Sequence, residues 1–309
     1  MSTSYCGFNP DEDLPDLSGK VILITGDTRG IGRTALLHLA KHSPEHIYFT
    51  GRNQAAADAV LAALSSGVKA TFLECGLASL ASVRAAAERF VHARLDIFIA
   101  NAGVMGVDAG LTADGFEVQF GTNHLGNATL LLRLLPVMRR TAAQPGADVR
   151  YVALTSLGYR GHPGEGIRFG TLRTPQADMP LGTWGRYGQS KLASVVFARE
   201  LARREPGIAG VVVHPGVVRT ELVTELGFWR RALVYVMNPL GMMTPEQGGC
   251  NTAWAAAAAG VREEVAKGKA ALFEPVGKAH AGDAASWDEK LAKELWEWTE
   301  KEVGVKGDV

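Results

Sequence analysis

The sequence predicts an α/β protein with one doubly wound parallel sheet, helices on both faces and a lid segment late in the chain. Two observations predict this fold. Short apolar runs rich in β-branched residues alternate with longer segments whose apolar residues recur at helical spacing, a pattern typical of a parallel sheet. The first apolar run also ends in a glycine-rich turn that leads directly into the first helical segment. No second domain is needed, so residues 18–309 are predicted to form a single domain.

The first half of the chain supplies strands and helices in strict alternation. Residues 20–25 (KVILIT) are the first predicted strand, and residues 31–42 are the helix that follows it. The same unit then repeats along the chain. The further predicted strands are 46–51, 69–75 and 95–103, and the further predicted helices are 55–66 and 82–93.

The second half continues the pattern with one interruption. A long helix is predicted from Asn123 to about Arg140, a strand over 148–156, a helix from about Tyr187 to Arg204 and a strand over 208–216. Residues 157–183 hold many Gly and Pro residues and no period, so they are predicted to form an irregular excursion at the rim of strand ends. The late segment 269–275 is predicted to add an edge strand, and 287–303 is predicted to be a helix with a Trp/Leu face.

Composition favours a cytoplasmic enzyme. The 309 residues carry 32 basic and 32 acidic side chains, so the formal net charge is zero and no long-range field attracts nucleic acid, which is not an expected partner. Cys6, Cys75 and Cys250 are an odd number outside any Cys-x-x-Cys or metal-binding pattern, which indicates a reduced compartment. The eight histidines form no ligand motif, so no metal is expected.

Two segments stand outside the alternation. Residues 1–17 are acidic and lack an apolar run, so they are predicted to be a flexible lead-in rather than a signal peptide or anchor. Residues 228–243 are apolar but interrupted by charges and a proline, so membrane contact is not expected. Residues from about 221 to 243 are predicted to form a mobile lid over an apolar pocket, with ordinary core packing as the alternative. The large apolar side chains of this lid are Phe228, Trp229, Leu233, Tyr235 and Met237.

The turn after the first strand is the candidate cofactor site. Residues 25–32 read TGDTRGIG, at the place where a dinucleotide pyrophosphate meets the N-terminus of a helix in a Rossmann-type sheet. Gly26 allows the tight turn, Gly30 lets a phosphate approach the backbone and Gly32 permits close helix packing. A glycine-rich turn can also serve only as a connection, but its placement favours the cofactor. The other predicted cofactor residues of this loop are Thr28, Arg29 and Ile31.

Two arginines at this edge predict NADP(H) as the cofactor. Arg29 lies in the glycine loop, and Arg52 follows the second strand, where an NAD enzyme usually places an acid that binds the ribose. Guanidinium groups suit a 2′-phosphate because they donate charge-assisted hydrogen bonds in a planar fork. The alternative is that both are solvated surface arginines.

Tyr187 and Lys191 are the candidate catalytic pair. They are four residues apart at the start of a predicted helix, so both project from one face, and a nearby ammonium group is expected to lower the pKa of the tyrosine from about 10. Ser156 closes a strand at the edge where such sheets place their sites, and its hydroxyl can polarise a carbonyl group. Asn123 opens the long helix, where an N-cap role is the alternative to a role in the site.

These residues together resemble the short-chain dehydrogenase/reductase family in order and placement, over about residues 18–260. The motifs are TGDTRGIG (25–32), NAG (101–103), Asn123, Ser156, YGQSK (187–191) and HPGVVRT (214–220). The segments SGKVILITG, DGFEVQFGTNHLG and YGQSKLASVVFARELARR are similar to the retinol-dehydrogenase and WW-domain-oxidoreductase branch, and the tail is similar to members from filamentous fungi.

The resemblance implies a role for each matching residue. Tyr187 would protonate the substrate oxygen, Ser156 would position it, Lys191 would lower the pKa of Tyr187 and hold the nicotinamide ribose, and Asn123 would support a water relay to Lys191. The implied contacts to the adenosine side are Asn101, Ala102 and Gly103. The implied contacts to the nicotinamide side are Pro215, Gly216, Val218 and Thr220, of which the last two would meet the carboxamide.

Two features depart from the family pattern. Gly76 stands where members usually carry an acidic residue that contacts adenine. The long segment between Ser156 and Tyr187 resembles an inserted loop that shields the surface other members use to dimerise, so both a monomer and a homodimer are open.

The expected activity is reduction of a ketone or aldehyde of a small, largely apolar molecule by NADPH, with alcohol oxidation as the reverse. One alternative is a redox-neutral step on the same fold, such as isomerisation or cyclisation, because a fold does not fix a reaction. Another is a catalytically silent NADP-binding protein, which the complete set of four catalytic residues disfavours. Net consumption of NADPH separates the first two.

We expect the Arg52→Asp variant to lose or reverse the preference for NADPH over NADH. Each charge-assisted hydrogen bond to the 2′-phosphate contributes on the order of 1.5 to 3 kcal/mol, and an aspartate repels the phosphate. Dissociation constants of both cofactors for both proteins measure this. Equal affinities in the unmutated protein would contradict the assignment of both arginines.

Overall fold

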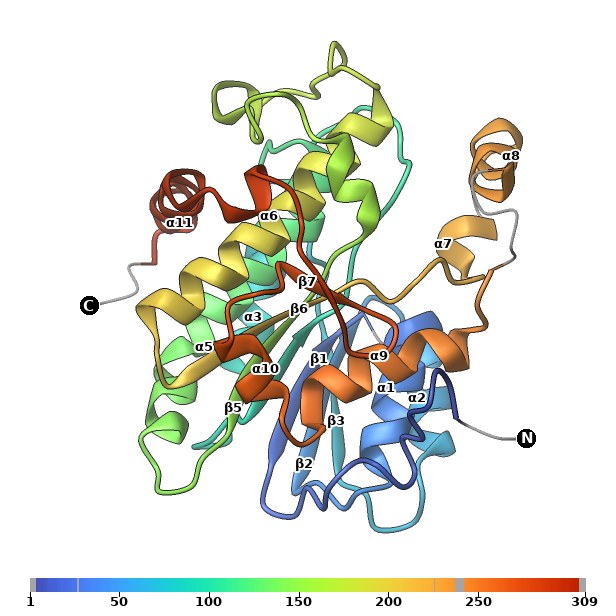
Figure 1. The fold of residues 1–309 in the computed structure, drawn as a ribbon, viewed down its shortest axis with the longest axis vertical. Coiled ribbons are helices and arrows are strands. Elements are labelled where there is room, and N and C mark those ends of the chain that lie inside the picture. Colours follow the sequence, from blue (N-terminus) through green and yellow to red (C-terminus); the bar gives the residue numbers. More distant parts are fainter. Residues whose placement is uncertain (1–3, 27, 225, 237–241, 306–309) are drawn as a thin grey trace.

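A computed structural model describes residues 4–26, 28–224, 226–236 and 242–305. An eight-stranded sheet crosses the molecule in the order β3-β2-β1-β4-β5-β6-β7-β8 (Figure 1). All neighbouring strands pair in parallel except β7 and β8, which are antiparallel. The predicted doubly wound parallel sheet is therefore confirmed. The strands are β1 (Val21–Thr25), β2 (His46–Gly51), β3 (Ala70–Glu74), β4 (Ile97–Ala100), β5 (Val149–Leu154), β6 (Ile208–Val213), β7 (Leu272–Glu274) and β8 (Lys278–His280).

The strand order reverses between β1 and β4. Leu23 of β1 lies opposite Tyr48 of β2 on one side and Phe98 of β4 on the other. The chain runs outward from β1 to β3, then crosses back to β4 and continues toward β8. In an open α/β sheet the crevice for a ligand lies at such a reversal, beyond the carboxyl ends of the strands.

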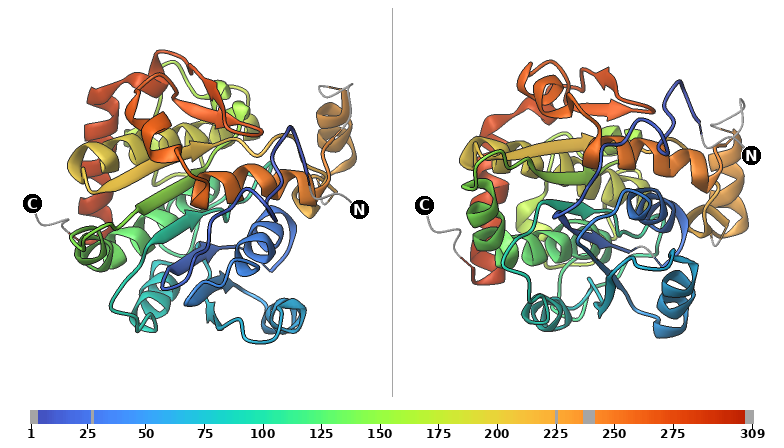
Figure 2. Two further views of the ribbon diagram at one scale, coloured as in Figure 1. Left: turned by 60° about the horizontal axis from the view of Figure 1, so that its bottom comes forward. Right: turned by 90° about the horizontal axis from the view of Figure 1, so that it is seen from below.

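Helices cover both faces of the sheet, as the two rotated views show (Figure 2). One apolar core joins the sheet to α1, α2, α9 and α10, and the other joins it to α3, α5, α6 and α11. Each core forms because the helix turns its apolar stripe toward the sheet. The bounds are α1 (Gly30–Ala40), α2 (Gln54–Ala63), α3 (Leu80–Glu88), α5 (Asn127–Ala142), α6 (Thr183–Arg204), α9 (Pro245–Ala257), α10 (Val261–Ala266) and α11 (Glu289–Val303).

The C-terminal helix α11 packs along α6, at the left of Figure 1. Trp296 of α11 is buried and stacks on Phe197 of α6 with ring centroids 4.8 Å apart and planes inclined by 18°. The hydroxyl of Thr299 lies 3.0 Å from Nε2 of His124, which is also buried. The predicted Trp/Leu face of this helix therefore contacts the protein, and it covers the outer side of the helix that carries Tyr187.

The rim at the carboxyl ends of the strands consists of short elements. The irregular excursion predicted over 157–183 is confirmed as far as residue 182, with two 3₁₀ turns, η2 (Leu157–Gly161) and η3 (Phe169–Thr171), as the helical elements among its described residues. The lid prediction falls on α7 (Glu221–Thr224) and α8 (Phe228–Val236), which stand apart from the sheet at the right of Figure 1. Residues 225 and 237–241 of that prediction, including Met237, lie outside the described residues.

Three sequence predictions differ from the structure. Asn123 does not open a helix, because α4 (Val118–Phe120) runs into a π-helical turn, η1 (Gly121–Gly126), and then into α5. The segment around β7 is not the edge of the sheet, because β8 folds back on it and takes that position. The helix that carries Tyr187 begins earlier, at Thr183, after Gly182 with φ of +56°.

The first residues pack more closely than a flexible lead-in does. Phe8, Leu14 and Leu17 are buried in the core that also holds α1 and α9. The backbone amide of Leu17 donates to the carbonyl of His42, 2.7 Å away, just after the end of α1. The apolar residues of this segment are not spaced like those of a helix or a strand, yet they are buried. An analysis of hydrophobic periodicity therefore does not detect their contribution to the core.

Candidate functional site

The glycine loop between β1 and α1 is shaped so that side chains are excluded from it. Gly26 has φ of +73° and Gly30 has φ of +62°, the left-handed region that favours glycine. A Cβ atom on Gly26 would lie 2.6 Å from that of Ala102. Residue 27 of the loop lies outside the described residues. The predicted turn therefore has the backbone conformation that its glycines suggest.

A polar cluster fastens this loop to the end of β4. The Thr25 hydroxyl accepts the backbone amides of Asn101 and Ala102 at 3.1 and 3.0 Å, and it donates to Oδ1 of Asn127 at 2.7 Å. The Asn101 side-chain amide donates to the carbonyls of Thr25 and Gly26 at 2.8 and 2.9 Å. Asn101 thus braces the loop. Asn127 is a site residue that sequence reasoning missed, although a polar residue buried between helical leucines is a signal that can be found.

The first turn of α1 follows directly on the glycine loop. Its N-cap is Arg29, whose side chain makes no capping hydrogen bond to the amides of that turn. Backbone amides and the helix dipole together favour an anion at such an end. The half-exposed guanidinium of Arg29 pairs with the carboxylate of Glu221 in α7. This pair links the glycine loop to the start of the lid.

Arg52 directly follows β2 and is exposed to solvent. The register places Glu74 of β3 opposite Gly51, so an acid lies on the neighbouring strand, which inspection of the residues after β2 alone did not detect. Asn53, next to Arg52, caps α2 by accepting the amide of Ala56 at 3.0 Å. Arg52 is therefore held at the strand end while its side chain stays accessible.

Tyr187 and Lys191 lie side by side on α6, and both are buried. The Lys191 ammonium nitrogen is 5.9 Å from the centroid of the Tyr187 ring and donates to the carbonyl of Leu154 at 3.0 Å. The hydroxyl of Thr155 donates to the Lys191 carbonyl at 2.9 Å. The end of β5 therefore fixes both the side chain and the backbone of Lys191.

Ser156 lies beside Tyr187 at the end of β5. Its hydroxyl oxygen accepts the amide of Gly158 at 3.1 Å and so caps η2. A Cβ atom on Gly158 would lie 3.4 Å from the Ser156 oxygen and 3.2 Å from the Tyr187 ring. The absence of a side chain at Gly158 therefore leaves the hydroxyls of Ser156 and Tyr187 room to share a small ligand.

Asn123 contacts the same site from the π-helical turn. Its Oδ1 accepts the amide of Val104 at 2.6 Å, and its amide group donates to the Val104 carbonyl and the Ser190 hydroxyl, each at 2.9 Å. A Cβ on Gly103 would lie 2.9 Å from Oδ1 of Asn123 and 3.6 Å from the Lys191 nitrogen. The N-cap alternative for Asn123 is wrong, because the helix is continuous through it. A π turn is frequent at functional sites because it moves side chains off the regular helical register.

Burial shifts the pKa values of both members of the candidate catalytic pair, Tyr187 and Lys191. It raises the pKa of Tyr187 to about 12, with a hydrogen bond from Ser156 acting in the opposite direction. Burial also lowers the pKa of Lys191 to about 8. The expected lowering of the Tyr187 pKa by Lys191 is therefore wrong, since desolvation of the phenolate is the largest effect and Lys191 is not among the causes of the shift.

The segment after β6 closes the site beside the glycine loop. Pro215 and Val218 are buried, and Gly216 has φ of +87°. Val218 pairs with Met243 in a parallel bridge. A Cβ on Gly30 would lie 3.4 Å from the Thr220 methyl group, so Thr220 faces the glycine loop. The residues predicted to contact the nicotinamide therefore lie at the same edge of the sheet as the glycine loop.

The predicted lid segment contacts the loop after β4. Arg230 of α8 donates to the Gly106 carbonyl at 2.6 Å and pairs with Asp108 at 2.7 Å. Leu226 is buried, and its side chain is the nearest neighbour of a Cβ built on Gly106, at 2.6 Å. Phe228 and Tyr235 are exposed. The side chains of Trp229 and Leu233, which the lid prediction also names, lie outside what the structure describes.

Other expected features concern the chain as a whole. Within the described part of the chain, no helix has the length and apolar character needed to cross a bilayer. Those residues also contain no group of three or more His, Cys, Asp and Glu side chains arranged to hold a metal ion. The three cysteines, all of which are described, form no disulfide bond with one another.

Comparison with known proteins gives consistent matches. A family model described as short chain dehydrogenase matches residues 20–151. The chain is similar to an uncharacterised oxidoreductase of Schizosaccharomyces pombe, with 36% identity over 311 residues that cover 96% of this chain and 90% of that protein. It is similar to retinol dehydrogenase 13 of Homo sapiens, with 35% identity over 94% of this chain and 86% of that protein. A solved structure from Mycobacterium paratuberculosis shares the fold, with a TM-score of 0.72 and 24% identity over 97% of this chain and 98% of that one.

Gly76 can accept a side chain. Its backbone amide donates to the Ser82 hydroxyl at 2.9 Å. Its φ lies outside the left-handed region, and a Cβ there would meet only the Ser82 oxygen, at 3.8 Å. Backbone shape therefore does not require glycine here. With glycine at this position, a ligand at the end of β3 lacks the carboxylate contact that an acidic residue would give.

We expect Gly76→Asp to tighten NADPH binding by about 1 kcal/mol, the contribution of one hydrogen bond to adenine. Gly76→Ala is the matched control, because it adds the Cβ without an acceptor and should leave the dissociation constant unchanged. Calorimetric titration of the three proteins measures the difference. Weaker binding by Gly76→Asp would sink the explanation.

Proposed function

The chain belongs to the short-chain dehydrogenase/reductase family and to its retinol-dehydrogenase-like branch, and on this basis we propose that it is an NADPH-dependent reductase of ketones or aldehydes. The substrate is a small, largely apolar molecule, and oxidation of the corresponding alcohol is the reverse reaction. One observation carries the proposal: Ser156, Tyr187 and Lys191 converge at the carboxyl end of β5, beside the strand reversal.

The residues at the glycine loop fit NADP(H). Gly26 and Gly30 leave a cradle that side chains would fill, and the first turn of α1 offers amide groups to a pyrophosphate. Arg29 and Arg52 supply guanidinium groups for a 2′-phosphate, and Arg29 would exchange Glu221 for the phosphate. The bound cofactor supplies the hydride.

The protein supplies the proton and holds the carbonyl group. With a pKa of about 12, Tyr187 keeps its proton at neutral pH, so it is prepared to donate to an oxygen that gains negative charge. The Ser156 hydroxyl, beside the phenol, donates to the same oxygen and orients it. Lys191, held by Leu154, places a positive charge close by, which favours the developing phenolate.

An apolar substrate is supported by the wall of the site. Leu226 and the ring of Trp184 are the side chains nearest to a Cβ built on Gly106, at 2.6 and 3.9 Å, so apolar groups pack against this residue of the loop after β4. The human relative is named for retinol, an apolar alcohol, and the same chemical class suits this wall. The reduced cysteines support a cytoplasmic location, and the cover of α11 over α6 is compatible with a monomer or with a homodimer that uses another surface.

We expect Tyr187→Phe to lower kcat for carbonyl reduction by 10² to 10⁴-fold or so, the usual contribution of a positioned acid, because only the transferable proton is removed. The NADPH dissociation constant should stay nearly unchanged, since the glycine loop and the arginines hold the cofactor. Steady-state kinetics and fluorescence titration measure the two quantities. A variant that keeps more than about a tenth of kcat contradicts the assignment and favours a redox-neutral reaction.

Lys191→Ala should behave differently from Tyr187→Phe. Lys191 is assigned both to the ribose and to the charge beside Tyr187, so its loss should weaken NADPH binding and turnover together. The same two measurements decide the matter. If the NADPH dissociation constant of Lys191→Ala is unchanged, Lys191 does not bind the ribose.

The pH profile of carbonyl reduction should follow Lys191. Because the pKa of Lys191 is about 8 and that of Tyr187 about 12, kcat/KM should be level below pH of about 8 and fall above it as the ammonium group loses its proton while the phenol keeps its own. In Lys191→Arg, which stays protonated, the fall near that pH should disappear from whatever activity is left. A profile that rises through this range contradicts the assignment.

A further inference from the structure

A buried ion pair lies one residue from the proposed acid. Nε of Arg186 is 3.4 Å from Oε1 of Glu117, and the two side chains are 5% and 0% exposed. Burying two charges is costly, and apolar residues of similar size often stabilise a fold as well or better. The pair therefore calls for an explanation beyond packing, and its neighbour Tyr187 suggests where to look for one.

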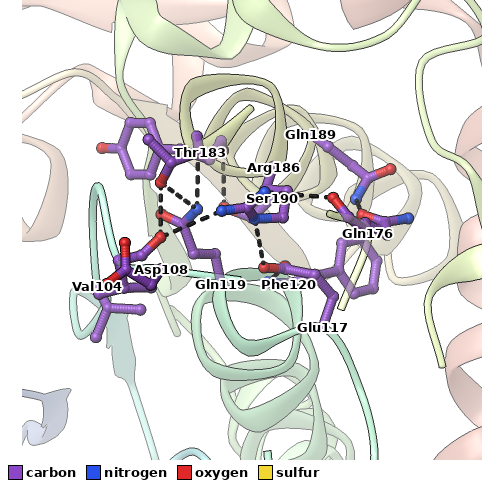
Figure 3. A network of polar contacts seen from close by, with 12 residues as sticks. Val104, Asp108, Glu117, Gln119, Phe120, Gln176, Thr183, Arg186, Gln189 and Ser190 are labelled. Atoms are coloured by element: carbon purple, nitrogen blue, oxygen red, sulfur yellow. Dashed lines mark hydrogen bonds and ion pairs between the residues drawn. The ribbon is translucent and has the colours of Figure 1, made fainter. Parts of the chain in front are cut away.

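Arg186 contacts segments on two sides of the site. Its Nη2 donates to the carbonyl of Val107, in the loop after β4, and its Nη1 donates to the carbonyl of Gln176, in the excursion before α6, each at 3.3 Å. Figure 3 shows the guanidinium group of Arg186 between Gln176 and Glu117. The planar fork of an arginine can satisfy several acceptors in fixed directions, which a lysine cannot do.

Two neighbours of Arg186 hold the same loop. The Thr183 hydroxyl donates to the Val107 carbonyl at 2.7 Å. Gln119 accepts the Gly106 amide at 3.0 Å and donates to the Thr183 carbonyl at 2.9 Å. The loop after β4 is thus tied to the first turn of α6, the helix that carries Tyr187 (Figure 3).

The excursion is tied to α6 in the same way. Gln189 donates to the side-chain oxygen of Gln176 at 2.9 Å and accepts the amide of Arg168 at 2.9 Å. Glu117 keeps the other end of the network fixed, because its Oε2 accepts the Phe120 amide at 2.6 Å where α4 begins. Arg186 is the residue that connects both the loop after β4 and the excursion to Glu117.

We propose that Arg186 is a positioning residue that sets the width of the substrate opening. It fixes the loop that carries Gly106 and Val107, and the excursion at Gln176, at set distances from Tyr187. The lid is coupled to the same loop, since Arg230 of α8 binds the opposite side of it at the Gly106 carbonyl. This inference rests on the proposed carbonyl reduction for its effect on substrates, but the geometry it assigns exists without any substrate.

The role is steric rather than electrostatic. The protonation of Tyr187 is set by burial and by Ser156, and Arg186 is not among its causes. Loss of Arg186 should therefore change which substrates fit and leave the pH profile unchanged. If Arg186 supported only stability, its loss would lower the folded fraction and reduce the apparent kcat/KM for all substrates by the same factor.

The test compares Arg186→Met with Arg150→Met. Arg150 is a matched control: it is buried, pairs with Asp148 at 2.5 Å and donates to the carbonyls of Ala255 and Ala258 at 3.1 and 3.0 Å. It is the second residue of β5, near the end of the strand away from the site. We expect Arg186→Met to change the ratio of kcat/KM between a small and a bulky apolar ketone at least about tenfold, since a displacement of about 1 Å can cost on the order of 10²-fold. Arg150→Met should leave the ratio unchanged.

Two milder variants keep the test valid if Arg186→Met does not fold. Arg186→Lys keeps a charge for Glu117 but lacks the fork, so stability should be retained while the ratio still shifts. Thr183→Val removes the hydroxyl that donates to Val107 and accepts from Gln119, but it leaves Arg186 in place, so it should shift the ratio in the same direction by less. An unchanged ratio in folded Arg186→Lys and Thr183→Val overturns the proposal.

Hydrogen exchange gives a readout that needs no substrate. In Arg186→Met or Arg186→Lys, peptides over 104–110 and 172–178 should exchange faster than in the unmutated protein, while peptides over 25–32 should not change. If no carbonyl compound is reduced, the proposed function fails but this measurement still decides the positioning role. The positioning role is overturned if exchange is unchanged in both segments. It is also overturned if exchange rises equally throughout the chain, as in a destabilised protein.

Discussion

The rest of the site depends on the hydrogen bonds that the hydroxyl group of Thr25 makes. At the end of β1 it accepts two amides from the end of β4 and donates to Asn127 of α5. Because the strand order reverses between β1 and β4, their helices leave toward opposite faces of the sheet and open a crevice. A single small polar side chain joins the two strand ends at the base of that crevice without filling it, so the glycine loop keeps its shape and stays accessible.

Burial has opposite effects on the pKa values of the two members of the proposed catalytic pair, and the raised pKa of Tyr187 keeps a proton on its phenol. Moving Tyr187 away from water disfavours its phenolate, while moving Lys191 away from water disfavours its ammonium form. The Leu154 carbonyl is a partner for the buried ammonium group. A tyrosine that keeps its proton beside a lysine with a pKa near the physiological range suits reduction of a carbonyl group better than a preformed phenolate does.

Close approach of helices to loops determines the remaining geometry. Gly103 lets the amide of Asn123 and the ammonium group of Lys191 come near one point of the backbone, and the π turn directs Asn123 toward it. The buried network around Arg186 then holds the next residues of the same loop. The loop after β4 is therefore fixed at successive residues by groups from η1, α4 and α6, so small changes in those helices are transmitted to the site.

The sequence by itself determined the alternation of strands and helices, the glycine turn, and the placement of Ser156, Tyr187 and Lys191, because periodicity and glycine spacing are local properties. Only the tertiary structure decided the π turn at Asn123, the partners of Asn127 and Arg186, and the raised pKa of Tyr187. Thr25 and Asn127 are 102 residues apart in the chain. Such contacts, and the burial that shifts a pKa, depend on which distant segments pack together, and no local pattern encodes that.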